Sequence, residues 1–243
     1  MVEGDVSARR DMKRFLDPDL IARTYRDPLS LLILVVDLLP ILAVIFYGWS
    51  ATPLVALYWL ENLIIGVFTI LRILANALSN RASLALSLFL IPFFFFHYGL
   101  FCFVHGIFLH VFAGIAETGG DAGAETPVGL VNWALSSGEG MIFFVLAIIG
   151  INAVLYATDF IGKGQFRDTN PMAEMFAPYG RIVTLHVAII LGAFLTLALG
   201  QPLTAVLFLI LLRVVFGMVF SILRRERLVK SNPLPNLDSL RSS

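Results

Sequence analysis

Long runs of apolar residues alternate with short polar stretches along most of the chain. A bilayer-spanning helix needs about 20 mostly apolar residues, because the backbone must satisfy its own hydrogen bonds where water is absent. Six stretches of the sequence meet this requirement. They cover Leu29–Tyr47, Pro53–Leu78, Leu84–Ala113, Met141–Phe160, Ile182–Leu199 and Pro202–Phe220. The pattern therefore predicts an all-α, polytopic transmembrane bundle of six helices.

The remaining residues divide the chain into three parts. Residues 1–28 are a charged amino-terminal segment that is predicted to be cytoplasmic, in which Asp17 and Pro18 mark the start of a predicted interfacial helix. Residues 29–222 are the predicted transmembrane domain, and residues 223–243 are a basic tail that we expect to be disordered. No cleavage site follows a short apolar core, so we expect the first span to stay in the mature protein.

Lysine and arginine are sorted between alternate loops. They occur before the first span, between the second and third, between the fourth and fifth, and after the sixth. Residues 48–52, 114–140 and 200–201 contain neither. Because loops rich in these residues stay in the cytoplasm, both termini are predicted to be cytoplasmic. We expect a multi-pass protein of the plasma membrane, with anionic lipid as a candidate partner at its basic cytoplasmic face.

Composition supports this picture and narrows the function. Hydrophobic residues make up 58% of the 243 residues and charged residues 14%, which lies outside the range of soluble globular domains. The chain has no glycine-rich nucleotide motif and no paired discontinuous segments, which weakens the ATPase and secondary-transporter interpretations. We expect the lipid bilayer as a partner, and no nucleic acid.

Two short segments outside the spans carry helix signals. In "NPMAEMFAPYGR", Asn170 is a predicted cap with Pro171 at the first turn, and Pro178 ends the helix. This pattern favours a helix that lies on the membrane surface. In "VGLVNWALSSG", Trp133 belongs to a short apolar piece that is expected in the outer interface.

The apolar stretch at residues 93–110 holds His97, His105 and His110, which are three of the four histidines in the chain. Ionisable residues inside a span cost a few kcal/mol, so each calls for a partner or a function. Counted from the nearest loop at about 1.5 Å per residue, Glu61 and His105 lie at the same outer depth. We predict that they form a coupled polar pair.

Several chemistries suit these residues. Glu61, His105 and Cys102 could bind a metal ion, since Cys102 and His105 share a helix face. One haem between His97 and His186 is an alternative, although the spacing of His97 and His110 does not fit two haems. Other interpretations are a proton or small-solute path and a non-catalytic scaffold in which the imidazoles only join helices.

An inner layer is predicted to contain Asp37, Arg72 and Arg213. Either Asp37 neutralises one arginine while the other reaches toward lipid phosphates, or the two arginines hold an anionic group. A rhomboid-type protease is rejected, because Ser137 and His186 are predicted near opposite membrane faces. The sequence therefore favours a protein that is not an enzyme.

Three segments resemble one family. They are "YWLENLIIGVFTILRIL", "FFFFHYGLFCFVHGIF" and "PYGRIVTLHVAIILGAF". Together they are similar to a family of prokaryotic multi-pass membrane proteins that is classified only as a domain of unknown function, over about residues 29–222. The resemblance implies a bundle with the same spans and draws attention to residues in these segments. It implies no activity.

Overall fold

The computed structural model describes residues 38, 40–116, 126–180, 182–183, 187 and 211. The chain divides into two compact units. One comprises Met1–Leu38 with Leu211–Ser243, and only Leu38 and Leu211 of it are described. The other is Leu39–Ile210, and all contacts reported below lie within it. The described residues form helices and turns, and no strand occurs among them.

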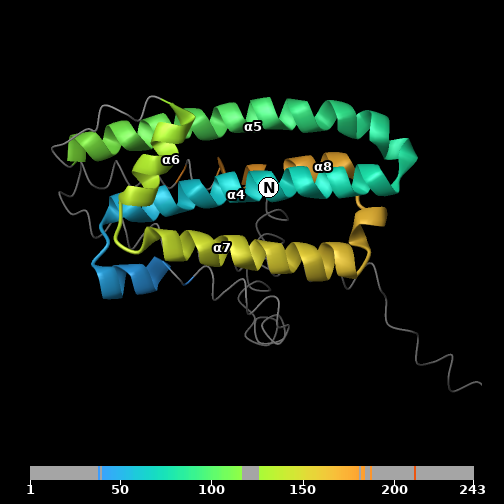
Figure 1. Cartoon of the computed structure of the whole chain (residues 1–243). Helices are drawn as coiled ribbons and strands as arrows, with labels where there is room; N and C mark the ends of the chain where they lie inside the picture. The colour runs from blue at the N-terminus through green and yellow to red at the C-terminus, as the bar shows by residue number, and fades with distance from the viewer. Residues whose placement is uncertain are drawn as a thin grey trace, which may run out of the picture. The chain divides into compact units, whose positions relative to one another are not determined.

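The described helices are arranged as Figure 1 shows, and between residues 127 and 176 they follow one another with short connections. Residues 40–47 are helical and lead to a turn at Gly48, whose φ is +63°. The elements that follow are α4 (Ala51–Ser79), α5 (Arg81–Ala116), α6 (Pro127–Ser136), α7 (Met141–Leu155), the π-helix η1 (Tyr156–Gly162), the 3₁₀-helix η2 (Gln165–Arg167) and α8 (Pro171–Phe176). This confirms the all-helical prediction for the described residues.

Three of the described helices are long and apolar enough to cross a membrane. They are Ala51–Ser79, Ser83–Val111 and Met141–Gly162, which match the predicted second, third and fourth spans. The first, fifth and sixth predicted spans lie mostly outside the described residues. The count of six spans therefore stays a prediction.

Helices α4 and α5 are an antiparallel pair separated only by Asn80. In the halves of the two helices that are distant from Asn80, the Trp59 indole donates a hydrogen bond to the Cys102 carbonyl oxygen at 2.7 Å. Closer to Asn80, the Tyr98 hydroxyl donates a hydrogen bond to the Asn62 carbonyl oxygen at 3.0 Å. These two bonds define which levels of the two helices face each other.

Glycine lets the two helices approach closely at two levels. A Cβ atom added at Gly106 would lie 2.7 Å from Cζ2 of Trp59, and one at Gly66 would lie 2.7 Å from Cε1 of Tyr98. Both aromatic rings therefore occupy the space that a side chain would need. Small residues at such positions are typical of tightly packed helices in membranes.

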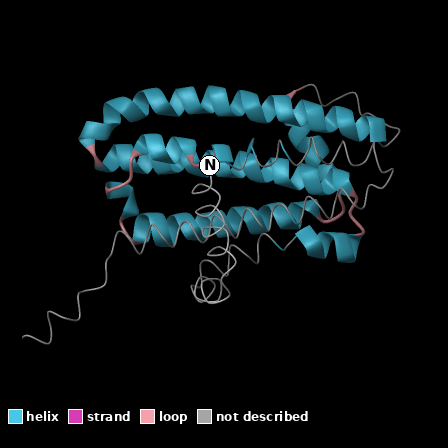
Figure 2. Cartoon of the chain, turned by 180° about the vertical axis from the view of Figure 1, so that it is seen from behind, coloured by secondary structure: helices cyan, strands magenta, loops and turns pink. Residues whose placement is uncertain are grey.

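The connections gather at two ends of the larger unit, as Figure 2 shows from behind. At one end, the Asn76 amide donates to the carbonyl oxygens of Phe166 and Thr169, which ties the end of α4 to the loop before α8. At the other end, the Trp49 indole donates to the Glu139 carbonyl oxygen at 3.0 Å. The first end carries Lys163 and Arg167, in agreement with the sorting of basic residues in the sequence.

Helix α8 begins as predicted and buries one side against the bundle, while Met172 and Phe176 are exposed. The Asn170 side chain accepts a hydrogen bond from the Met172 backbone N–H at 2.9 Å, and Pro171 occupies the first turn. Met175 is buried in one cluster with Ile73 of α4 and Leu90 of α5. Helix α8 packs against both long helices (Figure 1), and its position at the membrane surface stays a prediction.

The chain continues past Pro178 in helical conformation. Residues 179–180 and 182–183 are helical, and the Ile182 backbone N–H donates to the Pro178 carbonyl oxygen at 3.3 Å. Ile182 belongs to the same buried cluster as Met175. The helical segment that was predicted to begin at Ile182 therefore packs against α4 and α5 from α8 onward.

Helix α6 contains the apolar piece around Trp133. Thr126 caps it, since its hydroxyl accepts from the Gly129 backbone N–H at 3.0 Å. The Trp133 ring meets the His110 ring of α5 edge-on, with the centroids 5.1 Å apart. The helix thereby covers the last described turns of α5, and His110 is part of this contact.

Candidate functional site: buried polar residues of α4 and α5

Glu61 and His105 are both almost fully buried. Their exposed fractions are 4% and 5%, and they come from neighbouring helices. Ionisable side chains are rarely buried to this extent unless they are paired or functional. The sequence-based prediction singled out the two residues that are the only buried ionisable acid and histidine of the described residues.

The bonds that join the helices lie close to Glu61 and His105 in the sequence. Glu61 lies two residues after Trp59, whose indole contacts both the Cys102 carbonyl and the Gly106 backbone region. His105 lies between Cys102 and Gly106 on the facing helix. Their common depth and a direct contact between their side chains both stay predictions.

The faces of the two helices refine this placement. At about 100° per residue, Glu61 points about 100° away from Asn62 and shares its face with Arg72. Arg72 pairs with Glu174, so this face of α4 is the one on which α8 lies. On α5, His105 shares a face with Tyr98, which packs against Met175 and Ile182. Glu61 therefore lies on the face of α4 that carries Arg72, and His105 lies on the face of α5 that carries Tyr98.

Hydrogen bonding indicates the tautomer of His105. Its Nδ1 lies 2.7 Å from the Phe101 carbonyl oxygen, one turn earlier in α5. Because a carbonyl oxygen only accepts, Nδ1 carries the proton. In the neutral ring, Nε2 is then the nitrogen that can take a proton or bind a cation.

The predicted metal centre is not assembled among the described residues. Within the part of the chain that the structure describes, no group of three His, Cys, Asp or Glu side chains is placed to hold a metal ion. This applies to Glu61, Cys102 and His105, all of which are described. A site formed by Glu61 and His105 with fewer protein ligands is compatible with this finding.

His97 lies at a different level from His105 and on the outside of the described helices. It is the middle residue of the candidate span Ser83–Val111. The sequence leaves its depth open between the inner layer and mid-membrane, because Pro92 can bend the helix. Its Nδ1 lies 2.8 Å from the Tyr179 hydroxyl, a partner that the sequence did not indicate. His186, the other residue of the predicted haem pair, lies outside the described residues.

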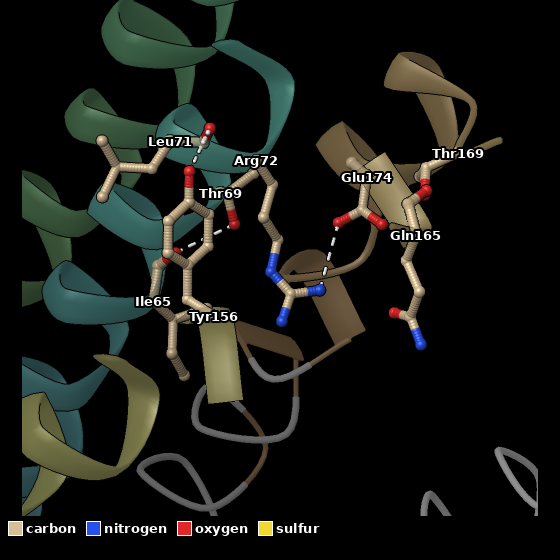
Figure 3. Close-up of polar contacts among 8 residues, drawn as sticks. All are labelled: Ile65, Thr69, Leu71, Arg72, Tyr156, Gln165, Thr169 and Glu174. Atoms are coloured by element: carbon tan, nitrogen blue, oxygen red, sulfur yellow. Dashed lines mark hydrogen bonds and ion pairs between the residues drawn. The ribbon is translucent and has the colours of Figure 1, made fainter. Parts of the chain in front are cut away.

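Arg72 has a partner that the sequence analysis missed. One guanidinium nitrogen lies 3.5 Å from a carboxylate oxygen of Glu174 in α8 (Figure 3). The guanidinium group also lies over the Phe160 ring, 5.0 Å from its centroid. The neighbouring Tyr156 hydroxyl donates to the Leu71 carbonyl oxygen at 3.2 Å. Asp37 and Arg213, the predicted companions of Arg72, lie outside the described residues.

The π-helix explains how Phe160 reaches Arg72. Helix α7 widens into η1, and such segments are rare and frequent at functional sites. Phe160 is 1% exposed and is stacked on Tyr156 one turn earlier. Three helical segments, α4, η1 and α8, therefore meet at one arginine. Nothing in the apolar pattern of α7 signals the change of helix type.

Asn76 is a second residue that the sequence analysis missed. It is 1% exposed, and its amide nitrogen donates to the carbonyl oxygens of Phe166 at 2.7 Å and Thr169 at 2.8 Å. In the sequence, the signal for this residue was an asparagine inside an apolar span. Asn76 joins α4 to the loop that precedes α8, and with the Arg72–Glu174 pair it holds this end of the bundle together.

Comparison with known proteins identifies a family and no activity. No curated protein and no solved structure matches this chain. The model of a family of unknown function, DUF6498, matches residues 19–233, which is most of the chain. This confirms the predicted resemblance to a family without an assigned function. The chain belongs to the DUF6498 family of unknown function.

Proposed function

We propose that the protein is a six-span plasma-membrane protein in which Glu61 and His105 form a buried site for a proton or a small cation. The observation that carries the proposal is the burial of both side chains, at 4% and 5% exposure, on two neighbouring antiparallel helices. Burial disfavours an ionised carboxylate, whereas an imidazolium or a bound cation favours it. Uptake of positive charge therefore stabilises the site.

The surroundings of the site support a defined geometry. Trp59, at 2% exposure, and Tyr98, at 3%, each join α4 to α5 through a hydrogen bond to a backbone carbonyl. These bonds bracket Glu61 along α4. A polar site that binds a small ion needs such rigid support, because its selectivity depends on the distances between its ligands.

The orientation is part of the proposal. Residues 166–169 lie at the same end as the turn between α4 and α5, and Trp49 and Glu139 meet at the other end. By the positive-inside rule, the end with Lys163 and Arg167 faces the cytoplasm and its anionic lipids. The site at Glu61 is then nearer the outer face.

Reporter fusions test the orientation. Fusions after Ser30 and Ser231 should report the cytoplasm, and a fusion after Gly123 should report the outer side, because the positive-inside rule assigns these segments to opposite faces. Each position is fused to two reporters in turn, one that is active only in the cytoplasm and one that is active only outside it, and the two activities are compared. Cytoplasmic activity of the Gly123 fusion would show that the orientation is wrong.

Fluorescence of Trp59 tests the site. In a protein with Trp49→Phe and Trp133→Phe, the remaining Trp59 lies next to Glu61 and contacts the turn that carries His105. Its emission in lipid nanodiscs should change with pH, with a measurable midpoint, because the charge of the carboxylate and imidazole beside it changes. Adding Na⁺, Ca²⁺ or Zn²⁺ separately shows whether a cation competes with the proton.

Variants of Glu61 and His105 test whether these two residues form the proposed site. Glu61→Gln keeps the shape of the side chain and removes its charge, so the midpoint should shift or disappear while the protein stays folded. His105→Gln should have a similar effect, and His110→Gln is the matched control because His110 contacts Trp133 instead. An unchanged titration in Glu61→Gln would mean that the proposed site does not exist.

A further inference from the structure

Five rings form a continuous ladder along one edge of α5. The rings at consecutive positions four residues apart have centroids 5.8, 5.2, 5.2 and 6.3 Å from one another. The members of this ring ladder are Phe89, Phe93, His97, Phe101 and His105. His97 is nearly parallel to Phe93, at an interplanar angle of 12°, so the ladder offers flat aromatic surface on both sides of an imidazole.

The ladder runs from a buried ring to an open surface. His105 at one end is 5% exposed, whereas Phe89, Phe93 and Phe101 are 64%, 41% and 43% exposed. His97, between Phe93 and Phe101, is exposed as well. It is the one polar member of this exposed part of the ladder.

His97 has hydrogen-bonding capacity that the described residues do not use. Its Nδ1 is engaged by the Tyr179 hydroxyl, and Nε2 has no partner among the residues that the structure describes. His97 lies 14 residues from each end of the candidate span Ser83–Val111, or about 21 Å along the helix. A ring nitrogen without a partner is costly in that apolar surrounding, because water does not replace the missing hydrogen bond.

We propose that His97, held by Tyr179, is a binding site for the ring of a membrane-soluble quinone or quinol. The ligand ring stacks on the ladder beside Phe93 or Phe101, and one of its oxygen atoms forms a hydrogen bond with Nε2 of His97. The inference concerns binding only and includes no electron transfer. It is independent of the Glu61 site.

Depth and chemistry select this ligand class. The middle of a span lies far from charged lipid headgroups, so a phosphate or an ammonium group does not reach it. A ligand there must be apolar overall and must carry a polar atom for the imidazole. If Tyr179 donates to Nδ1, Nε2 carries a proton and donates to a quinone carbonyl, and if Tyr179 accepts, Nε2 accepts from a quinol hydroxyl. Both forms of the ligand therefore fit.

Photolabelling of the full-length protein in nanodiscs tests the proposal. A photoreactive azidoquinone should label residues near His97, and mass spectrometry locates the label. A short-chain ubiquinone analogue should compete with it, whereas an alkylbenzene with the same tail should not, because it lacks the oxygen atoms. In His97→Phe, which keeps a ring in the ladder, the affinity for the analogue should fall about tenfold.

Three further variants and one measurement complete the test. His110→Phe is the matched control and should bind like the wild type, whereas Tyr179→Phe should weaken binding because the His97 ring loses its fixed orientation. Equal competition by the alkylbenzene, or unchanged affinity in His97→Phe, overturns the proposal. The oligomeric state by mass photometry tests a second copy as the occupant. If His97→Phe or His97→Gln reduces a dimer and leaves quinone labelling unchanged, the surface is a subunit contact and the proposal is wrong.

Discussion

Replacing Gly106 by alanine is expected to lower the free energy of unfolding by about 1–3 kcal/mol, as overpacking of a tight interior does. The added Cβ would lie 2.7 Å from Cζ2 and 2.9 Å from Cε2 of Trp59. That indole is 2% exposed and is fixed by its hydrogen bond to Cys102, so it cannot move aside cheaply. Unfolding of the purified protein in detergent by heat or by SDS measures the effect.

Gly99→Ala is the matched control on the same helix. Nothing lies within 4 Å of a Cβ added at Gly99, so this variant should be as stable as the wild type or slightly more stable. Gly66→Ala should resemble Gly106→Ala, because its Cβ would meet the Tyr98 ring at 2.7 Å. Equal stability of the Gly99 and Gly106 variants would contradict the close approach of α4 and α5.

Replacing Asn76 by alanine is expected to cost about 2–4 kcal/mol and to free the loop before α8, because two carbonyl oxygens lose their donor. These are the oxygens of Phe166 and Thr169, at 2.7 and 2.8 Å from the amide nitrogen. The loop should then be cut by protease at Lys163 or Arg167 at a lower enzyme concentration than in the wild type. Limited proteolysis in nanodiscs and thermal unfolding measure the two effects.

Asn152→Ala is the control variant. It shows the effect of removing an asparagine whose side chain bonds within its own helix instead of to the loop before α8. The Asn152 amide donates only to the Ile148 carbonyl oxygen of its own helix, at 2.8 Å. Its removal should change stability by less than about 1 kcal/mol and leave proteolysis of the loop unchanged. If both variants are cut at the same enzyme concentration, Asn76 does not hold the loop.

The parts of the fold that depend on neighbouring residues could be predicted from the sequence. Apolar runs of sufficient length predicted α4, α5 and α7, and the Asn170–Pro171 pair predicted the start of α8. The burial of α8 could not be predicted in this way. Glu174 lowers the local hydropathy, and Pro178 is a usual stop signal, so the segment resembled a surface helix. Its burial depends on a partner, Arg72, that is distant in sequence.

The residues of the candidate site could be predicted from the sequence better than the contacts that they make. The sequence singled out Glu61 and His105 as an acid and a histidine inside apolar runs, and both side chains are buried, whereas their common depth stays a prediction. The depth of His97 stayed ambiguous in the sequence because Pro92 could bend the helix. In the structure, α5 includes Pro92, and the partner of His97 comes from Tyr179, beyond a turn that hydropathy does not detect.

The length of α5 has a consequence for the membrane that surrounds the protein. Its 36 residues measure about 54 Å along the axis, whereas the hydrocarbon layer of a typical bilayer is about 30 Å thick. A helix that exceeds the layer by this much must tilt strongly or extend into the headgroups. Because α4 is joined to α5 through only Asn80, the two tilt together. Lipids with shorter or longer acyl chains should therefore change the angle of the pair, so acyl-chain length is a variable that reconstitution can adjust.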